Sequence, residues 1–128
     1  MIVVVSCHPT PDDERIYHRQ IKTLLGNGYP ITYFTRSKSE LDLSESGLKH
    51  INLNTNHSLK SYMSEILNQL NVVNSPSILH IHDPYLLRLA KIVKDRFGTK
   101  IIYDVHEDYP AIIDTFSRLG TSLKLIKK

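Results

Sequence analysis

The stretch SILHIHDPYLLRLAKIVKDRFGTKIIYDV, residues 77–105, contains a strand, a helix and a second strand in succession. Its two ends, Ser77–His82 and Lys100–Val105, are short apolar runs, which predicts strands. Between them, apolar residues recur at helical spacing from Leu86 to Phe97 and stop before Gly98, a residue typical of helix C-termini. A strand, a helix and a strand in this order form the repeating unit of parallel sheets.

The rest of the chain repeats this alternation. Further strands are predicted at Ile2–Ser6, Pro30–Thr35 and Leu48–Leu53, with a helix from near Glu14 to the stop signal Gly26-Asn27-Gly28 and another over Leu59–Leu70. Several of these strands are apolar almost throughout, as strands covered on both faces should be. With 128 residues, the chain fits a single domain. We therefore predict an α/β fold with a Rossmann-like, doubly wound parallel sheet.

Composition narrows the function without naming it. The formal net charge is +3, and the basic residues are interspersed with acids, which argues against a nucleic-acid partner. The single cysteine, Cys7, allows no internal disulfide, so we expect a cytoplasmic protein. The polar stretch from Ser37 to Ser46 predicts an exposed loop.

Two segments bear on membrane contact. The apolar run Ile2–Val5 is far shorter than the ~20 residues needed to cross a bilayer, so it predicts a buried strand. The tail Leu123–Lys128 mixes apolar and basic residues. Such a tail is typical either of a segment lying on the anionic inner face of a membrane or of a helix that is cut short.

The predicted sheet also indicates where a ligand would bind. In an open parallel sheet, ligands bind beyond the carboxyl ends of the strands, where the strand order reverses. The residues just beyond the first, fourth and fifth predicted strands are Cys7-His8, His82-Asp83 and His106-Glu107. We expect these polar side chains to meet at one pocket, where His106 could donate hydrogen bonds or shuttle a proton.

Several nearby residues also have plain structural explanations. Asp83 precedes Pro84, which suits a helix N-cap, and this role can coexist with ligand binding. Asp12, Asp13 and Glu14 could cap the first helix, and Arg15 could pair with them; for Asp12 we favour this explanation. His80, on the same side of its strand as His82 but one step deeper, is expected to be a hydrogen-bonded core residue.

The loop after the first strand, Cys7–Pro11, contains no glycine. It therefore cannot form the tight phosphate-binding turn of a dinucleotide fold, and we expect no nucleotide cofactor. Spaced histidines with carboxylates can hold a metal ion, so His8, His80, His82, Asp104 and His106 leave a metal-dependent hydrolase as an alternative. Our preferred interpretation includes no metal.

Two motifs, HIHDPYLL at residues 80–87 and KIIYDVHEDYP at residues 100–110, resemble the N-terminal domain of family-four glycosyltransferases. The opening segments SCHP, residues 6–9, and DDERIYH, residues 12–18, are similar to the histidine-proline and acidic, arginine-isoleucine opening of that family. The resemblance implies the two-domain GT-B fold, of which residues 1–128 would be the N-terminal, acceptor-side half. It also implies a sugar acceptor, either a glycan or a lipid-linked sugar.

The resemblance further implies roles for individual residues. His106 would be catalytic and face the reacting sugar, and the acceptor would contact His8, Asp13, Arg15, His82, Asp83 and Glu107. The donor-binding half of the family has no counterpart before Lys128, so a nucleotide-sugar donor would bind only with a C-terminal domain or a partner chain. We therefore expect the isolated chain to transfer no sugar and to self-associate through apolar surface left uncovered. The alternative is a non-catalytic module that binds a sugar or a protein.

Overall fold

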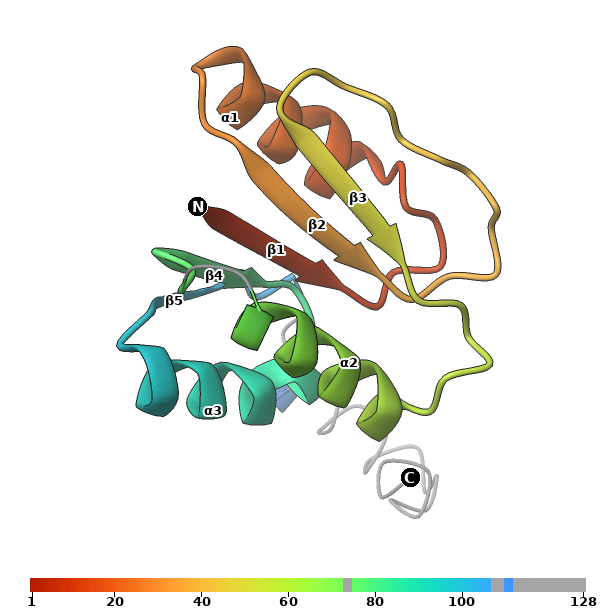
Figure 1. The fold of residues 1–128 in the computed structure, drawn as a ribbon. Coiled ribbons are helices and arrows are strands. Elements are labelled where there is room, and N and C mark those ends of the chain that lie inside the picture. Colours follow the sequence, from red (N-terminus) through yellow and green to blue (C-terminus); the bar gives the residue numbers. More distant parts are fainter. Residues whose placement is uncertain (73–74, 107–109, 112–128) are drawn as a thin grey trace.

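Five parallel strands form one sheet in the computed structural model, which describes residues 1–72, 75–106 and 110–111 (Figure 1). The spatial order of the strands is β3-β2-β1-β4-β5. Their bounds are β1 Ile2–Ser6, β2 Ile31–Thr35, β3 Leu48–Asn52, β4 Ile78–Ile81 and β5 Lys100–Tyr103. The predicted α/β fold with a Rossmann-like parallel sheet is confirmed, and the order reverses between β1 and β4 as expected.

The last two strands are shorter than their apolar runs predict. The backbone N–H of Asp104 donates to the carbonyl oxygen of Ile81 at 3.0 Å, and beyond this bond the chain leaves the sheet. β4 therefore ends before His82, and β5 ends before Asp104 instead of at Val105. Both polar residues thus lie at the carboxyl edge of the sheet.

One face of the sheet is covered by a helix that changes type along its length. It consists of η1, a π-helix over Glu14–Ile21, and α1, an α-helix over Lys22–Gly26. The carbonyl oxygen of Asp13 accepts hydrogen bonds from the backbone N–H groups of both Tyr17, at 2.9 Å, and His18, at 3.2 Å, which widens the first turn. The predicted helix is confirmed in position, but its first part has the wider geometry that is frequent at functional sites.

The opposite face is covered by α2, Leu59–Val72, and by α3, Leu87–Phe97, which follows the short 3-10 helix η2, Pro84–Leu86 (Figure 1). Helix α3 ends at Gly98, whose φ of +67° lies in the left-handed region that glycine adopts most easily. The predicted stop signal is therefore confirmed. Among the described helices, none has the length and apolarity to cross a lipid bilayer.

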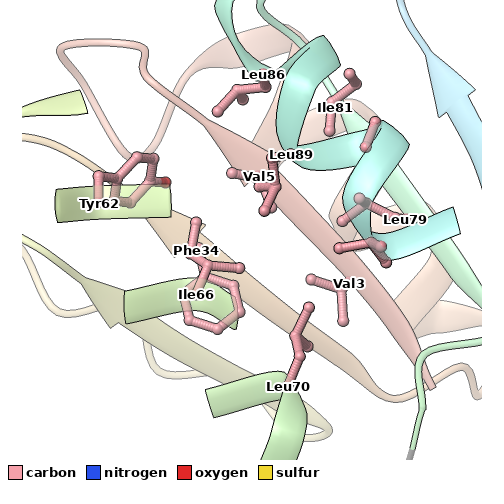
Figure 2. Close-up of a cluster of buried hydrophobic side chains, with 12 residues drawn as sticks. Val3, Val5, Phe34, Tyr62, Ile66, Leu70, Leu79, Ile81, Leu86 and Leu89 are labelled. Atoms are coloured by element: carbon pink, nitrogen blue, oxygen red, sulfur yellow. The ribbon is translucent and has the colours of Figure 1, made fainter. Parts of the chain in front are cut away.

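Two hydrophobic cores lie on the two faces of the sheet. Val5 and Ile81, which are partners in the β1–β4 register, face α2 and α3 and pack with the aromatic rings of Phe34 and Tyr62 (Figure 2). Val4 belongs to the other core, beneath η1 and α1. Because side chains alternate between faces, His80, the register partner of Val4, lies on the η1 face.

The polar segment after β2 differs from the predicted exposed loop. Ser37 and Leu43 are buried within it. The Asn52 side chain donates hydrogen bonds to the carbonyl oxygens of Ser37, at 3.1 Å, and Ser39, at 3.0 Å. The prediction is wrong for Ser37 and Leu43, because a polar residue at the end of β3 holds the loop against the sheet.

The orientation of α3 can be tested with two leucines on the same helix. Leu89 is fully buried, whereas 46% of Leu87 is exposed. We expect Leu89→Ala to lower the free energy of unfolding by about 2–5 kcal/mol, because it leaves a cavity in the core. The matched change Leu87→Ala should alter it by no more than about 0.5 kcal/mol. Urea denaturation measures both values, and equal effects would contradict the orientation described.

Candidate functional site

A pocket of about 280 Å³ opens at the carboxyl edge of the sheet. Four separate parts of the chain contribute to it: the segment after β1, the start of η1, the segment after β4 and the segment after β5. Its lining residues are His8, Asp13, Arg15, Ile16, His82, Asp83 and His106. The structure thus brings together six of the seven residues predicted for the site, and the seventh, Glu107, lies outside the described residues.

Asp13 lines the pocket and is the N-cap residue of η1. Its Oδ1 atom accepts hydrogen bonds from the backbone N–H groups of Arg15, at 3.0 Å, and Ile16, at 2.9 Å. Partial burial raises its pKa, but the bond from Ile16, the nearby His8 ring and the bond from Arg15 lower it overall. Asp13 is therefore ionised at neutral pH, and it provides the cap while Asp12 is exposed.

Asp83 ties two strand ends together. Its Oδ2 atom accepts a hydrogen bond from the backbone N–H of Cys7 at 2.8 Å, and its side chain makes no capping bond to η2. The predicted cap is wrong because the carboxylate turns toward β1. Burial, helped by the negative charge of Asp83, raises the pKa of the Cys7 thiol to about 12. Cys7 is thus protonated at neutral pH and is a poor nucleophile.

Asp104 connects η1 to the end of β5. The guanidinium of Arg15 donates to Oδ1 at 2.5 Å, and the side-chain amide of Gln20 donates to Oδ2 at 2.7 Å. Burial raises the pKa of Asp104, but the Gln20 bond, Arg15 and His106 lower it overall, so the carboxyl group is ionised. The sequence predicts that Arg15 pairs with the acids of its own helical turn. In the structure it pairs instead with Asp104, at the end of β5.

His82 occupies the buried centre of the site. Its Nδ1 atom lies 2.9 Å from Nε2 of His106 and 3.6 Å from Oδ2 of Asp104. Burial, together with the neighbouring His80 and His106 rings, lowers the pKa of His82 to about 3. The His82 ring is therefore neutral and carries a single N–H.

The surroundings of His82 determine which nitrogen carries that proton. The Asp104 carboxylate stabilises a proton on Nδ1, the nitrogen that faces it, and in this tautomer Nδ1–H would donate to Nε2 of His106. A proton on Nε2 would instead be a buried N–H without an acceptor, since Nε2 has no partner among the described residues. His106 consequently accepts at Nε2, and in its neutral form it carries its own proton on Nδ1.

Among the described residues, His80 has no partner for the hydrogen bond expected of it. Its ring centroid lies 4.3 Å from that of His82, and its buried Nε2 atom has no partner among the described residues. Burial lowers the pKa of His80, so this ring also favours the neutral form. His80 packs beneath His82 on the η1 face and is absent from the pocket lining.

The same cluster offers a partial metal site. His80, His82 and Asp104 each have a potential ligand atom, and these atoms lie within 4.8 Å of one another. However, both oxygens of Asp104 are already bonded, one of them by the cationic Arg15 guanidinium. A second positive charge beside that guanidinium would be repelled. The geometry therefore favours a hydrogen-bonding site over a metal site, and it disfavours the alternative of a metal-dependent hydrolase.

Comparison with known proteins does not assign this arrangement to a family. No family model matches the chain, and none of the curated proteins matches it. The pocket and the motifs that supply its residues are therefore the features that indicate a function.

Sequence reasoning missed the roles of Asp104, Gln20 and Ile16. The apolar pattern extends the last predicted strand to Val105, whereas β5 ends at Tyr103, so Asp104 follows β5 as directly as His82 follows β4. Gln20 is an unremarkable helical residue in the sequence, and no local pattern indicates its bond to Asp104. The apolar Ile16 belongs to the core beneath η1 and also lines the pocket, and no sequence pattern indicates this second contact.

The neutral state of His82 predicts a pH dependence of stability. Its pKa is lowered from 6.5 to about 3 by folding, so the unfolded chain binds a proton that the folded chain does not. Stability from this source is fully present above pH 6.5 and is lost as pH falls toward the folded-state pKa, by about 1.4 kcal/mol per pH unit at most. Urea denaturation between neutral and mildly acidic pH measures this slope.

Two variants isolate the contribution of His82. His82→Asn should make the decline in unfolding free energy below pH 6.5 shallower, whatever its effect on stability at neutral pH. His18→Asn supplies the matched control, because it removes an exposed imidazole that lies outside the site. An unchanged slope in His82→Asn would show that His82 is not held neutral by burial.

Proposed function

We propose that this chain is the acceptor-side domain of a GT-B glycosyltransferase, which binds a sugar acceptor in the pocket beside His106. The main support for the proposal is that the pocket residues come from the segments that resemble this family. The four segments that resemble family-four glycosyltransferases supply His8, then Asp13, then His82 and Asp83, and finally His106, and all of these line one pocket. The order of the sheet brings these distant segments to one edge, and the resemblance accounts for the polar residue types that they carry there.

The chemistry of the pocket suits a polyhydroxylated ligand. All of its lining residues except Ile16 carry hydrogen-bonding side chains. Its volume of about 280 Å³ is near the lower end of the range of about 300–1,000 Å³ for small-molecule sites, which fits one sugar unit of a longer acceptor. Asp83 Oδ1 takes no hydrogen bond from the described residues, so it is available to a sugar hydroxyl.

His106 would contribute a hydrogen-bond donor to the proposed sugar transfer. With Nε2 accepting from His82, the neutral ring would present Nδ1–H, a nitrogen that has no partner among the described residues. An N–H donor can orient a sugar hydroxyl or stabilise negative charge that develops during transfer. A general base would instead need a free lone pair on that nitrogen.

The pocket offers little to bind the donor. Among the described lining residues, Arg15 is the only one with a permanent positive charge, and it is paired with Asp104. The leaving diphosphate of a nucleotide sugar needs positive charge or backbone N–H groups, which a donor-binding half would supply. The proposal therefore places transfer in a complex of this chain with such a half.

The proposal predicts sugar binding without sugar transfer. In an amide NMR titration with glucose, galactose, mannose and N-acetylglucosamine, we expect at least one sugar to shift the signals of pocket residues. Asp83→Asn should weaken that binding about tenfold, because a bond between a hydroxyl and a carboxylate becomes a weaker neutral one. The exposed Asp42 supplies a matched control, since Asp42→Asn should bind as the unaltered chain does.

Transfer itself is measured with labelled nucleotide sugars and the same sugars as acceptors. We expect no product from this chain alone and product when a donor-binding half is supplied, either in the same reading frame or from a neighbouring gene. Transfer by the chain alone would contradict the division of labour proposed here. Failure of every sugar to shift a pocket signal would contradict the proposal as a whole.

A non-catalytic sugar-binding module is the second candidate, because the pocket lacks an unpaired cation among its described residues. The two candidates differ in what His106→Ala does once a donor-binding half is present. A glycosyltransferase would lose transfer while retaining part of its sugar binding. A binding module would show no transfer with or without His106.

A further inference from the structure

The carboxylates of the site differ in how their negative charge is balanced. Asp104 has the guanidinium of Arg15 as a counter-ion and accepts a further hydrogen bond from Gln20. Asp13 accepts two backbone hydrogen bonds at one oxygen, and its other oxygen lies 3.5 Å from Nε2 of His8. The negative charges of both groups are therefore met by partners within the protein.

Asp83 has no such counter-charge. Its Oδ2 atom accepts one hydrogen bond, from the backbone N–H of Cys7, and its Oδ1 atom accepts none from the described residues. None of the ion pairs in the described part of the chain includes Asp83. The group is partly buried and lines the pocket. A partly buried carboxylate with one unoccupied oxygen favours a positively charged partner.

The cations nearby are committed elsewhere. Among the described lining residues, Arg15 alone has a permanent positive charge, and its guanidinium is engaged in the ion pair described above. Arg36 follows β2 outside the pocket lining, and its Nε atom donates to the carbonyl oxygen of His57 at 2.8 Å. Burial lowers the pKa of His82 to about 3, so this ring adds no positive charge. The positive charge that Asp83 lacks can therefore come from a ligand.

The hydroxyl group of Tyr33 also indicates negative charge at this edge of the sheet. Burial is the main cause of its raised pKa, and the charges of Asp13, Asp83 and Asp12 raise that pKa further. These three carboxylates come from two separate segments, so their charges act together on one region. Because like charges repel, this field disfavours a ligand that carries a carboxylate or a phosphate group.

We infer that the pocket selects a sugar with a free amino group, and that Asp83 is the residue that determines this specificity. The protonated amine donates a hydrogen bond to Oδ1 of Asp83 and supplies the missing positive charge. The sugar hydroxyls bond to the other polar lining residues, as in the proposed function, on which this inference rests. A metal ion is a poorer match for the same carboxylate, because it needs several ligand atoms and Asp83 offers one free oxygen.

Matched sugars test this specificity in an amide NMR titration of the full chain. Glucosamine, galactosamine and mannosamine are each compared with the parent hexose, in which a hydroxyl replaces the amine. We expect at least one amino sugar to bind about tenfold tighter than its parent, because a hydrogen bond between two charged groups replaces one between a charged and a neutral group. Glucuronate should bind more weakly than glucose. A high salt concentration should reduce the preference for the amine, since it screens the charges.

Two variants locate the preference on one side chain. Asp83→Asn should lower the affinity for the amino sugar about tenfold more than the affinity for its parent, so that the preference disappears. The asparagine oxygen can still accept from the N–H of Cys7 and keep the two strand ends joined. Asp12→Asn removes an exposed negative charge near the pocket and should retain most of the preference. The salt titration uses the unaltered chain, so it does not depend on the folding of either variant.

The possible failures are distinguishable. Equal affinities for the amino sugars and their parent hexoses, or tighter binding of glucuronate, would overturn the inference and leave the proposed sugar site intact. Equal loss of the preference in Asp83→Asn and Asp12→Asn would assign it to the general field of the pocket and overturn the role of Asp83. If no sugar of either kind shifts a pocket signal, the proposed function fails together with this inference.

Discussion

The carboxylate of Asp104 holds the site together. It follows β5 and binds Arg15 and Gln20 of η1, and it lies beside His82 at the end of β4. These contacts join the helix on one face of the sheet to the ends of two strands. Without an ionised carboxylate at this position, the Arg15 guanidinium would lose its partner, and the Nδ1 atom of His82 would lose the negative charge that stabilises its proton. The shape of the pocket and the hydrogen-bonding state of its histidines therefore depend on the same group.

The sheet supplies the second constraint, because its order brings β1 between β2 and β4. The carboxyl ends of β1 and β4 are adjacent, and the bond from the Cys7 N–H to Asp83 fixes their separation. His82 is then directed into a buried space where a charged imidazole would be unfavourable. A neutral, oriented His82 in turn leaves His106 as a donor toward the ligand. The same packing that stabilises the domain thus sets the chemistry that the pocket can offer.

Much of this arrangement could be predicted from the sequence, and the failures have physical reasons. The apolar periodicity of the strands and helices determines the layers, so the sheet and the edge that carries the site followed from pattern alone. The partners of Asp83, Arg15 and Asp104 did not, because each makes its decisive contact with a residue more than seventy positions away. Local rules assign such residues to caps and neighbouring ion pairs. The burial of Ser37 was missed for a similar reason, since it depends on Asn52 of another strand.

The central claim is that Asp104 and His82 fix His106 as a hydrogen-bond donor through its Nδ1 atom. Nitrogen-15 NMR of the histidine rings at neutral pH tests this directly, because protonated and unprotonated ring nitrogens have distinct chemical shifts. We expect both His82 and His106 to carry their proton on Nδ1, with Nε2 of His106 unprotonated and coupled through the hydrogen bond to His82. A proton on Nε2 of His106 at that pH would reverse the direction of the bond and contradict the account.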